Sequence, residues 1–212
     1  MMSRKAEGEH MKKGLMLVIS GPTGCGKGTV LSELMNMSDE FVYSVSATTR
    51  APREGEVNGV NYHFITKEEF ERRIAADEML EHAKFCDNYY GTPKKEAEEV
   101  LASGKNLILE IEVNGAMQIK KKFSDAVLIM LLPPDHKTQE KRLRGRGTET
   151  DEVIAKRLDT ARFELSHLPE YDYAVVNEDG KITESALAII DIVKAERFAT
   201  KRNQDIQKNY FN

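Results

Sequence analysis

A glycine-rich stretch near the start of the chain has the residue types needed to bind phosphate. It follows an apolar run, Leu15 to Ile19, and precedes a helical pattern, so we expect a strand, a loop and a helix. Glycines free successive backbone N–H groups to surround phosphate oxygens, and the new helix directs its positive end to the same place. The expected phosphate-binding residues are Gly21, Pro22, Thr23, Gly24, Cys25, Gly26, Lys27, Gly28 and Thr29.

The lysine of this loop is followed by Gly28, and the hydroxyl residue Thr29 comes one position later. In the motif G-x-x-x-x-G-K-[ST] the hydroxyl follows the lysine directly and ligates Mg²⁺. Because it is displaced here, we expect no direct protein ligand, with Mg²⁺ held through nucleotide phosphates and water. Lys27 would reach the β- and γ-phosphates as a mobile point charge. The G-K-G-T form resembles nucleoside monophosphate kinases more than GTPases or motor ATPases.

Two further groups of charged residues suit an anionic ligand. Arg50 and Arg53 flank Pro52, and this spacing lets two guanidinium groups converge on one phosphate, although each alone would be an ordinary surface charge. Glu110 and Glu112 end a predicted strand over Lys105 to Val113. Carboxylates at the end of a buried strand face the ligand crevice in open α/β sheets, the alternative being solvated edge residues.

The remaining pattern predicts strands that alternate with helices. Apolar runs predict buried parallel strands at residues 15–19 and 126–132, and two further core strands are expected at residues 105–113 and 173–177. Helices are expected at residues 29–37, 67–76, 93–100, 138–143, 151–166 and 182–197. Residues 46–92 predict a small, hairpin-rich insert that contains three of the seven tyrosines. Three arginines and two glycines in residues 142–147 predict a mobile basic loop.

Composition limits the functional classes. The 212 residues carry 40 % hydrophobic and 31 % charged side chains with a net charge of −4, so no general field attracts nucleic acid. Cys25 and Cys86 are too few for a disulfide framework and suit a reducing cytosol. We find no membrane-spanning run and no signal-peptide core, and therefore expect a cytoplasmic protein without membrane partners.

Taken together, four motifs closely resemble the guanylate kinase family. They are S-x-T-T-R-x-P-R-x-G-E from Ser46, N-G-x-x-Y from Asn58, N-Y-Y-G-T from Asn88 and R-G-R-G-T-E-T from Arg144, in the order of that family. The resemblance runs from about Leu15 to Lys194. It implies ATP and GMP as substrates, Mg²⁺ as cofactor, and transfer of the γ-phosphoryl group of ATP to GMP. The oligomeric state stays open.

The resemblance also implies roles for individual residues. The GMP site would comprise Ser46, Arg50, Arg53, Tyr62, Glu81, Tyr90, Thr92 and Glu112, with Glu81 accepting the two adjacent N–H donors of guanine. Glu110 and Glu112 stand where the family usually has aspartate. Asn177 would begin a loop that contacts adenine. The catalytic cations would be Lys27, Arg50, Arg142, Arg146 and Arg157.

The implied fold is α/β, with a parallel sheet core of the P-loop NTPase type flanked by helices, an inserted small mixed-β GMP-binding domain and a helical lid. The core would comprise residues 14–45, 93–137 and 169–199, the GMP-binding domain 46–92 and the lid 138–168. Residues 1–13 would be a disordered lead-in and 200–212 a polar tail. Two alternatives remain: a sugar-phosphate or other nucleoside monophosphate kinase on the same scaffold, or a non-catalytic protein-binding module.

Overall fold

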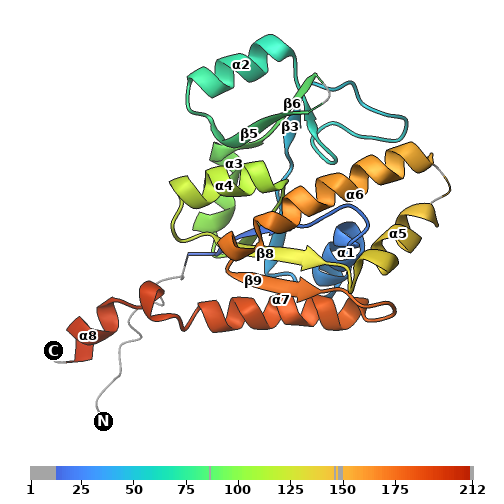
Figure 1. Ribbon diagram of the computed structural model, residues 1–212. Helices are drawn as coiled ribbons and strands as arrows, with labels where there is room; N and C mark the ends of the chain where they lie inside the picture. Colours follow the sequence, from blue (N-terminus) through green and yellow to red (C-terminus); the bar gives the residue numbers. More distant parts are fainter. Residues whose placement is uncertain (1–12, 86, 146, 148–149, 211–212) are drawn as a thin grey trace.

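The structure is a computed structural model that describes residues 13–85, 87–145, 147 and 150–210 (Figure 1). Its centre is a parallel sheet of five strands in the order β2-β7-β1-β8-β9. The strands are β1 (Met16–Ser20), β2 (Phe41–Tyr43), β7 (Asn106–Glu110), β8 (Val127–Leu132) and β9 (Tyr173–Val176). All five residues of β1 are buried, as expected for a central strand with helices on both faces.

Helices cover both faces of this sheet. Alternate residues of β1 point to opposite sides, so Leu17 joins one core cluster and Val18 the other. The first cluster is closed by α1 (Lys27–Met37) and α7 (Ile182–Glu196), and the second by α3 (Lys94–Ala102) and α4 (Val113–Lys122). The predicted parallel core with flanking helices is therefore confirmed.

A second, mixed sheet lies beyond the carboxyl end of β7, at the top of Figure 1. Its strand order is β4-β3-β6-β5, with β3 parallel to β4 and antiparallel to β6. The strands are β3 (Ala47–Thr48), β4 (His63–Phe64), β5 (Met79–Phe85) and β6 (Asn88–Pro93). Helix α2 (Lys67–Ala75) packs on it through Phe70, whose ring stacks on Tyr89 with centroids 5.2 Å apart.

Two helices form an arm between the sheets, and Figure 1 shows the longer one crossing from the core toward the second sheet. They are α5 (His136–Arg144) and α6 (Asp151–Ser166). Each begins at a side-chain cap: Asp135 accepts a hydrogen bond from the Thr138 amide, and Thr150 accepts one from Val153. The short 3₁₀ helix η1 (Leu168–Glu170) then leads into β9.

The structure differs from the sequence prediction in several elements. Strand β2 was not predicted, and Arg142 and Arg144 lie in the last turn of α5 rather than in a mobile basic loop. β9, predicted as a buried strand, is an edge strand in which Val176 is exposed.

The strand predicted over Lys105 to Val113 ends at Glu110, because Glu112 takes an extended conformation as the N-cap of α4, a helix that we did not predict. The expected polar tail contains η2 (Thr200–Arg202) and α8 (Asp205–Tyr210). Buried Glu196 anchors this segment by accepting hydrogen bonds from Arg202 and Tyr173.

Candidate active site

The loop between β1 and α1 is shaped by glycines with left-handed backbone angles. Gly24 has φ 81° and Gly26 has φ 88°, a region that side chains with a Cβ rarely adopt. At Gly26 space is also limiting, since a Cβ there would lie 2.5 Å from Nδ2 of Asn177. At Gly28, by contrast, a Cβ would meet nothing within 4 Å. Because these positions lack a Cβ, the backbone of the loop can lie close to an anion bound at the N-terminus of α1.

Lys27 lies over this loop. Its Nζ donates a hydrogen bond to the carbonyl oxygen of Gly21, and it lies 3.8 Å from Sγ of Cys25. Burial raises the pKa of the Cys25 thiol, and the neighbouring Lys27 charge only partly offsets this. Cys25 is therefore a buried, neutral side chain within the loop, and the positive charge of the loop is that of Lys27.

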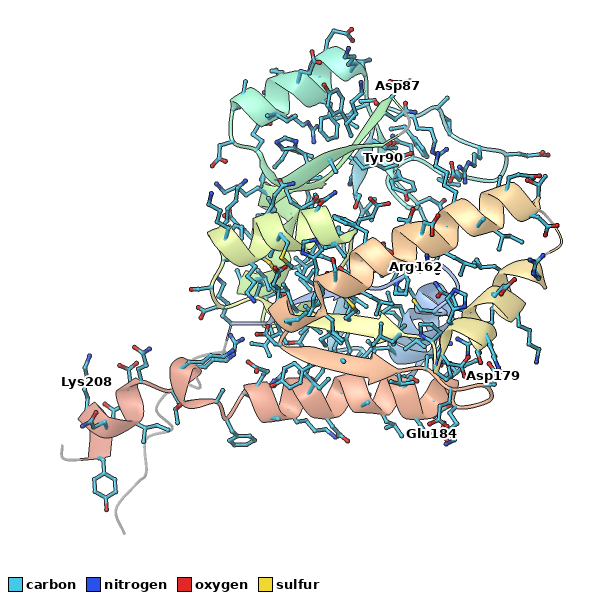
Figure 2. All side chains as sticks on the ribbon, in the orientation of Figure 1. Asp87, Tyr90, Arg162, Asp179, Glu184 and Lys208 are labelled. Carbon is cyan, nitrogen blue, oxygen red and sulfur yellow. The ribbon has the colours of Figure 1, made fainter. Side chains whose placement is uncertain are left out.

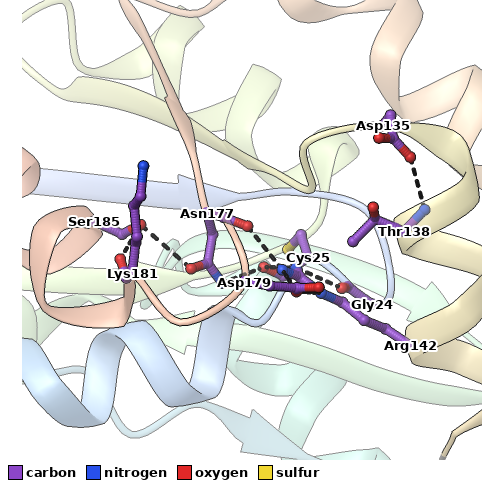
Figure 3. A network of polar contacts seen from close by, with 9 residues as sticks. All are labelled: Gly24, Cys25, Asp135, Thr138, Arg142, Asn177, Asp179, Lys181 and Ser185. Atoms are coloured by element: carbon purple, nitrogen blue, oxygen red, sulfur yellow. Dashed lines mark hydrogen bonds and ion pairs between the residues drawn. The ribbon is translucent and has the colours of Figure 1, made fainter.

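A polar network holds the outer side of the loop (Figure 3). Nδ2 of Asn177 donates to the carbonyl of Cys25 at 2.9 Å, and Oδ1 of Asn177 accepts from the hydroxyl of Ser185 at 3.3 Å. Arg142 donates to the carbonyl of Asn177 at 2.9 Å and forms an ion pair with Asp179 at 2.6 Å. These contacts fasten the end of β9 and helix α5 to the phosphate-binding loop.

The helical arm contacts the same loop at Thr23. Gln139 on α5 donates to the Thr23 carbonyl at 2.9 Å, and Arg157 on α6 donates to its hydroxyl at 3.0 Å. Gln139 is buried, whereas Arg157 is half-buried and faces the space above the loop. Two consecutive helices, both distant from Thr23 in the sequence, thus contact this one loop residue.

A cavity of about 270 Å³ lies between the second sheet and the carboxyl end of β7. Figure 2 shows Tyr90 on the side of the second sheet that faces α6. The residues that line the cavity come from both sheets and from the start of α4: Ser46, Tyr62, Glu81, Ala83, Tyr90, Gly91, Glu110, Ile111, Glu112 and Gly115. Five predicted site residues, drawn from distant parts of the sequence, therefore border one cavity.

Glu81 is the most deeply placed charge in this cavity. Its side chain belongs to a residue only 3 % exposed, and Oε1 accepts a 2.8 Å hydrogen bond from the hydroxyl of buried Thr92. Burial raises the pKa of Glu81 to about 7, and the hydrogen bond from Thr92 acts in the opposite direction. A ligand that presents N–H donors to this carboxylate would stabilise its ionised form.

Arg50 does not line the cavity itself but lies among aromatic rings, next to Tyr62, which does. Its guanidinium lies 5.5 Å from the ring centroid of Tyr62 and 5.7 Å from that of Phe64. The rings of Tyr62 and Tyr90 meet edge to face with centroids 6.1 Å apart. Arg50 also holds Glu56 by two hydrogen bonds of 2.9 Å, which lower the pKa of Glu56 to about 2. A guanidinium that binds a carboxylate through two hydrogen bonds can bind a phosphate with the same geometry.

The predicted residue Arg53 stands apart from this group. It is exposed on the loop after β3, and its backbone N–H donates to Glu56 at 2.7 Å. Glu56 therefore joins the Arg50 side chain to the backbone at Arg53. This places the backbone of both predicted arginines on one turn, whereas the convergence of their guanidinium groups on one phosphate stays a prediction.

Glu110, the last residue of β7, has a partner that the sequence did not reveal. The hydroxyl of Tyr43, at the end of β2, donates to Oε2 of Glu110, and burial together with this carboxylate raises the pKa of Tyr43. β2 pairs with β7, so Tyr43 and Glu110 meet at the carboxyl edge of the sheet. A hydroxyl residue at the end of a three-residue strand was too weak a signal to identify this contact.

Glu164 on α6 was also missed. It is half-buried, and burial raises its pKa to about 7, with the charge of Lys27 lowering it and that of Glu112 raising it. The charges that act on Glu164 therefore come from Lys27 of the phosphate-binding loop and from Glu112 of the cavity wall. The position of Glu164 among polar residues of a long helix gave no sequence signal.

The other predicted residues are placed as follows. Asn177 is buried against the loop, Arg142 lies on its outer side, and Arg157 reaches Thr23. Arg146 lies outside the described residues. In the part of the chain that the structure describes, no group of three or more His, Cys, Asp or Glu side chains is arranged to hold a metal ion. Within the same ranges, no helix is long and apolar enough to cross a membrane.

Comparison with known proteins gives a consistent result. Residues 13–195 match the family described as guanylate kinase. A guanylate kinase of Lactiplantibacillus plantarum is 50 % identical over 192 residues, covering 90 % of this chain and 92 % of that protein. One from Clostridium perfringens (strain SM101 / Type A) is 47 % identical over 190 residues, covering 90 % and 87 %. The crystal structure of guanylate kinase from Anaplasma phagocytophilum superposes with a TM-score of 0.71 at 37 % identity, covering 90 % of each chain.

Proposed function

This chain belongs to the guanylate kinase family, and we propose that it transfers the γ-phosphoryl group of ATP to GMP, giving ADP and GDP. The observation that carries the assignment of substrates is the buried Glu81 carboxylate in a cavity beside the phosphate-binding loop. The cavity would hold GMP, and the loop would hold ATP. The reacting phosphates would lie between them.

Glu81 would select the base. Guanine presents its N1–H and its 2-amino group as adjacent donors, and one carboxylate can accept both in parallel. Adenine has an acceptor at N1 and would leave the buried carboxylate without a partner, which is where large discrimination arises. Thr92 holds Oε1 of Glu81, and Ser46 lines the same cavity. These three residues form the proposed guanine-binding set.

The phosphate of GMP would lie at the opposite side, against Arg50, Arg53, Tyr62 and Tyr90. The two tyrosines line the cavity, and Arg50 lies over the ring of Tyr62. Glu56 already satisfies the guanidinium of Arg50 through two hydrogen bonds, so it orients this side chain before the substrate arrives. Glu112, also at the cavity wall, would face the ribose and phosphate side of the same site.

ATP would bind along residues Gly21 to Thr29, with its triphosphate on the backbone N–H groups and Lys27 on the β- and γ-phosphates. The catalytic cations would be Lys27, Arg50, Arg142, Arg146 and Arg157. Within this set Arg142 holds the outer side of the loop through Asn177 and Asp179, whereas Arg157 reaches its inner side at Thr23. Arg157 is thus the described arm residue best placed to meet the transferring group.

Catalysis would rest on positioning and charge neutralisation. An oxygen of the GMP phosphate attacks the γ-phosphorus of ATP in line, and the bond from that phosphorus to the bridging oxygen of ADP breaks. A phosphate dianion is already nucleophilic, so no covalent intermediate and no strong general base are needed. Water must be excluded from the reacting groups while both substrates are bound. The arm formed by α5 and α6 would therefore act as a lid.

The residues present fit a metal ion carried by the substrate. Mg²⁺ usually keeps several water ligands and binds through substrate phosphates rather than an all-protein cage. Gly28 follows Lys27 at the position where the motif has its metal-ligating hydroxyl, so the phosphates of ATP and water would hold the ion. When bound, Mg²⁺ neutralises charge on these phosphates.

The division into units follows from the same assignment. Residues 14–45, 93–137 and 169–199 would form the P-loop core, 46–92 the GMP-binding domain and 138–168 the lid. We place the activity in the cytoplasm, where ATP is supplied and where the free, buried thiol of Cys25 stays reduced. The intact Lys27 argues against the alternative of a non-catalytic binding module.

The experiment that tests this function follows phosphorus atoms by ³¹P NMR in a mixture of ATP, GMP and Mg²⁺. We expect ADP and GDP to appear in equal amounts, and no ADP to form when GMP is left out. Lys27→Met should abolish both signals, because this substitution keeps the length of the side chain and removes its charge. Formation of ADP without GDP would refute the proposed transfer.

A further inference from the structure

Strand β5 contains an irregularity at the base-reading carboxylate. Met79 pairs with Pro93 and His82 pairs with Gly91, so β5 has one residue more than β6 between these two pairs. The extra residue falls at Leu80 and Glu81, opposite Thr92. A bulge of this kind interrupts the ladder of backbone hydrogen bonds and redirects a side chain. Here it turns Glu81 toward the cavity and toward the hydroxyl of Thr92.

Side chains of helix α4 bind backbone groups beside the bulge, along β5, which is an edge strand of the second sheet. Gln118 binds both backbone groups of His82: its Nε2 donates to the carbonyl at 2.8 Å, and its Oε1 accepts from the amide at 3.2 Å. Lys122 donates to the carbonyl of Leu80 at 3.0 Å. The residues on both sides of Glu81 are therefore fixed by one helix of the core. Without Gln118 and Lys122, the amide and carbonyl of His82 and the carbonyl of Leu80 would lose these hydrogen bonds, which would destabilise the bulge.

The same helix also leaves room for the carboxylate itself. A Cβ at Gly115 would lie 2.7 Å from Oε2 of Glu81 and 3.3 Å from its Cδ. Gly115 thus permits the second oxygen to lie against the first turn of α4. Residues 115, 118 and 122 are three and four positions apart, so they share one face of the helix.

We propose that this face of α4 positions Glu81 for base recognition, and that Gly115 and Gln118 are specificity-determining residues for a purine monophosphate with adjacent N1–H and 2-amino donors. Gln118 does not line the cavity, so it acts through the backbone of His82. Gly115 acts through the space that it leaves for Oε2 of Glu81. This inference rests on the proposed function, because it concerns the same substrate site.

The test compares two acceptors that differ in one group. Inosine monophosphate (IMP) keeps the N1–H of GMP and lacks its 2-amino group, so the ratio of kcat/KM for GMP to that for IMP measures the pairing of the second donor. We expect Gln118→Met, which keeps length and loses both hydrogen bonds, to lower this ratio by about 10-fold. The KM for ATP should stay unchanged. Lys121→Met, on an exposed neighbour in the same helix, is the matched control and should alter nothing.

Gly115→Ala provides an independent variant, since it adds a single carbon against Oε2. It should lower the same ratio by about 10-fold or more, and circular dichroism establishes that each variant is folded. In a background of Glu81→Gln, neither substitution should lower the ratio further, because residues that act through one group are not additive. Independent, multiplying effects would show that α4 contributes only to stability and would overturn the inference.

The design separates this inference from the function on which it rests. If Glu81→Gln lowers the ratio and the α4 variants do not, the base site stands and the positioning role of α4 is wrong. If Glu81→Gln itself leaves the ratio unchanged, the carboxylate does not read the base, and the proposed site fails with it.

Discussion

The hydroxyl of Thr92 donates a 2.8 Å hydrogen bond to Oε1 of Glu81, a residue that is only 3 % exposed. This contact favours the ionised carboxylate, and burial opposes it more strongly, so the pKa of Glu81 rises to about 7. The free site is therefore poised between two protonation states near neutral pH. Because guanine donates two N–H groups, its binding would favour the ionised state.

The first prediction concerns pH. Below about pH 7 the carboxyl of the free site is protonated, so GMP binding must release that proton, and the KM for GMP should rise about tenfold per pH unit as the pH falls. Above pH 7 the carboxylate is already ionised, and KM should level off. Steady-state kinetics between pH 5.5 and 8.5, on the order of one measurement per half unit, checks this.

The control for that prediction is Glu81→Gln, which cannot titrate. The phosphate of GMP itself titrates near pH ~6, and dividing the parent values by those of the variant removes this contribution. Parent and variant profiles of the same shape would contradict the role assigned to Glu81.

Arg157 should act mainly on turnover. It reaches the hydroxyl of Thr23 at 3.0 Å, on the side of the loop where the transferring group would lie. We expect Arg157→Ala to lower kcat by about 10³-fold with little change in the KM for GMP. Arg162→Ala is the matched control, because Arg162 lies on the same helix, is exposed and pairs with Asp159. A rise in KM at unchanged kcat would make Arg157 a binding residue instead.

Arg142 should act mainly on ATP. Its guanidinium pairs with Asp179 at 2.6 Å and donates to the carbonyl of Asn177, so it holds the outer side of the loop. Arg142→Ala should raise the KM for ATP about tenfold and leave the KM for GMP within about twofold. Lys141→Ala, the preceding residue of α5, serves as control, since Lys141 is exposed. Equal increases in the KM for ATP and the KM for GMP would contradict the assignment of Arg142 to ATP binding.

Gly28 should tolerate substitution by serine, which would supply the hydroxyl that the motif G-x-x-x-x-G-K-[ST] has directly after the lysine. Nothing lies within 4 Å of a Cβ at Gly28, and the position is helical, so Gly28→Ser should keep or slightly raise stability, by about 0.5 kcal/mol. With a hydroxyl beside the phosphates, half-maximal activity should need less Mg²⁺. Gly26→Ser is the contrast: with φ 88° and Asn177 at 2.5 Å, it should cost about 1–3 kcal/mol. An unchanged Mg²⁺ requirement in Gly28→Ser would refute the metal argument.

Much of the fold could be predicted because its core strands are apolar on both faces. The runs at β1, β8 and β9 and the glycines before Lys27 each gave a local signal, and the parallel core followed from their alternation with helices. Helix α4 escaped prediction, because its residues continue directly from a strand and its N-cap Glu112 makes no side-chain cap hydrogen bond. Its start is set by packing of Val113 and Ala116 on the core rather than by a local signal.

The site was predictable to a lesser degree. Lys27 stands in a motif, but Glu81 is one carboxylate among many, and only the resemblance to a family singled it out. Its burial depends on a bulge in β5 and on the absence of a side chain at Gly115, which no local pattern encodes. Tyr43 and Gln118 were missed for the same reason, since each acts on a residue far away in the sequence.

The most direct test of the central claim is a coupled ADP-release assay with ATP and Mg²⁺ that compares GMP, AMP, CMP and UMP as acceptors for the parent and for Glu81→Gln. We predict strong turnover with GMP alone in the parent, and a loss of about 10²-fold or more in kcat/KM for GMP in the variant at unchanged KM for ATP. Turnover with another acceptor, or a variant that uses GMP as well as the parent does, would contradict the assignment of Glu81 as the residue that reads guanine.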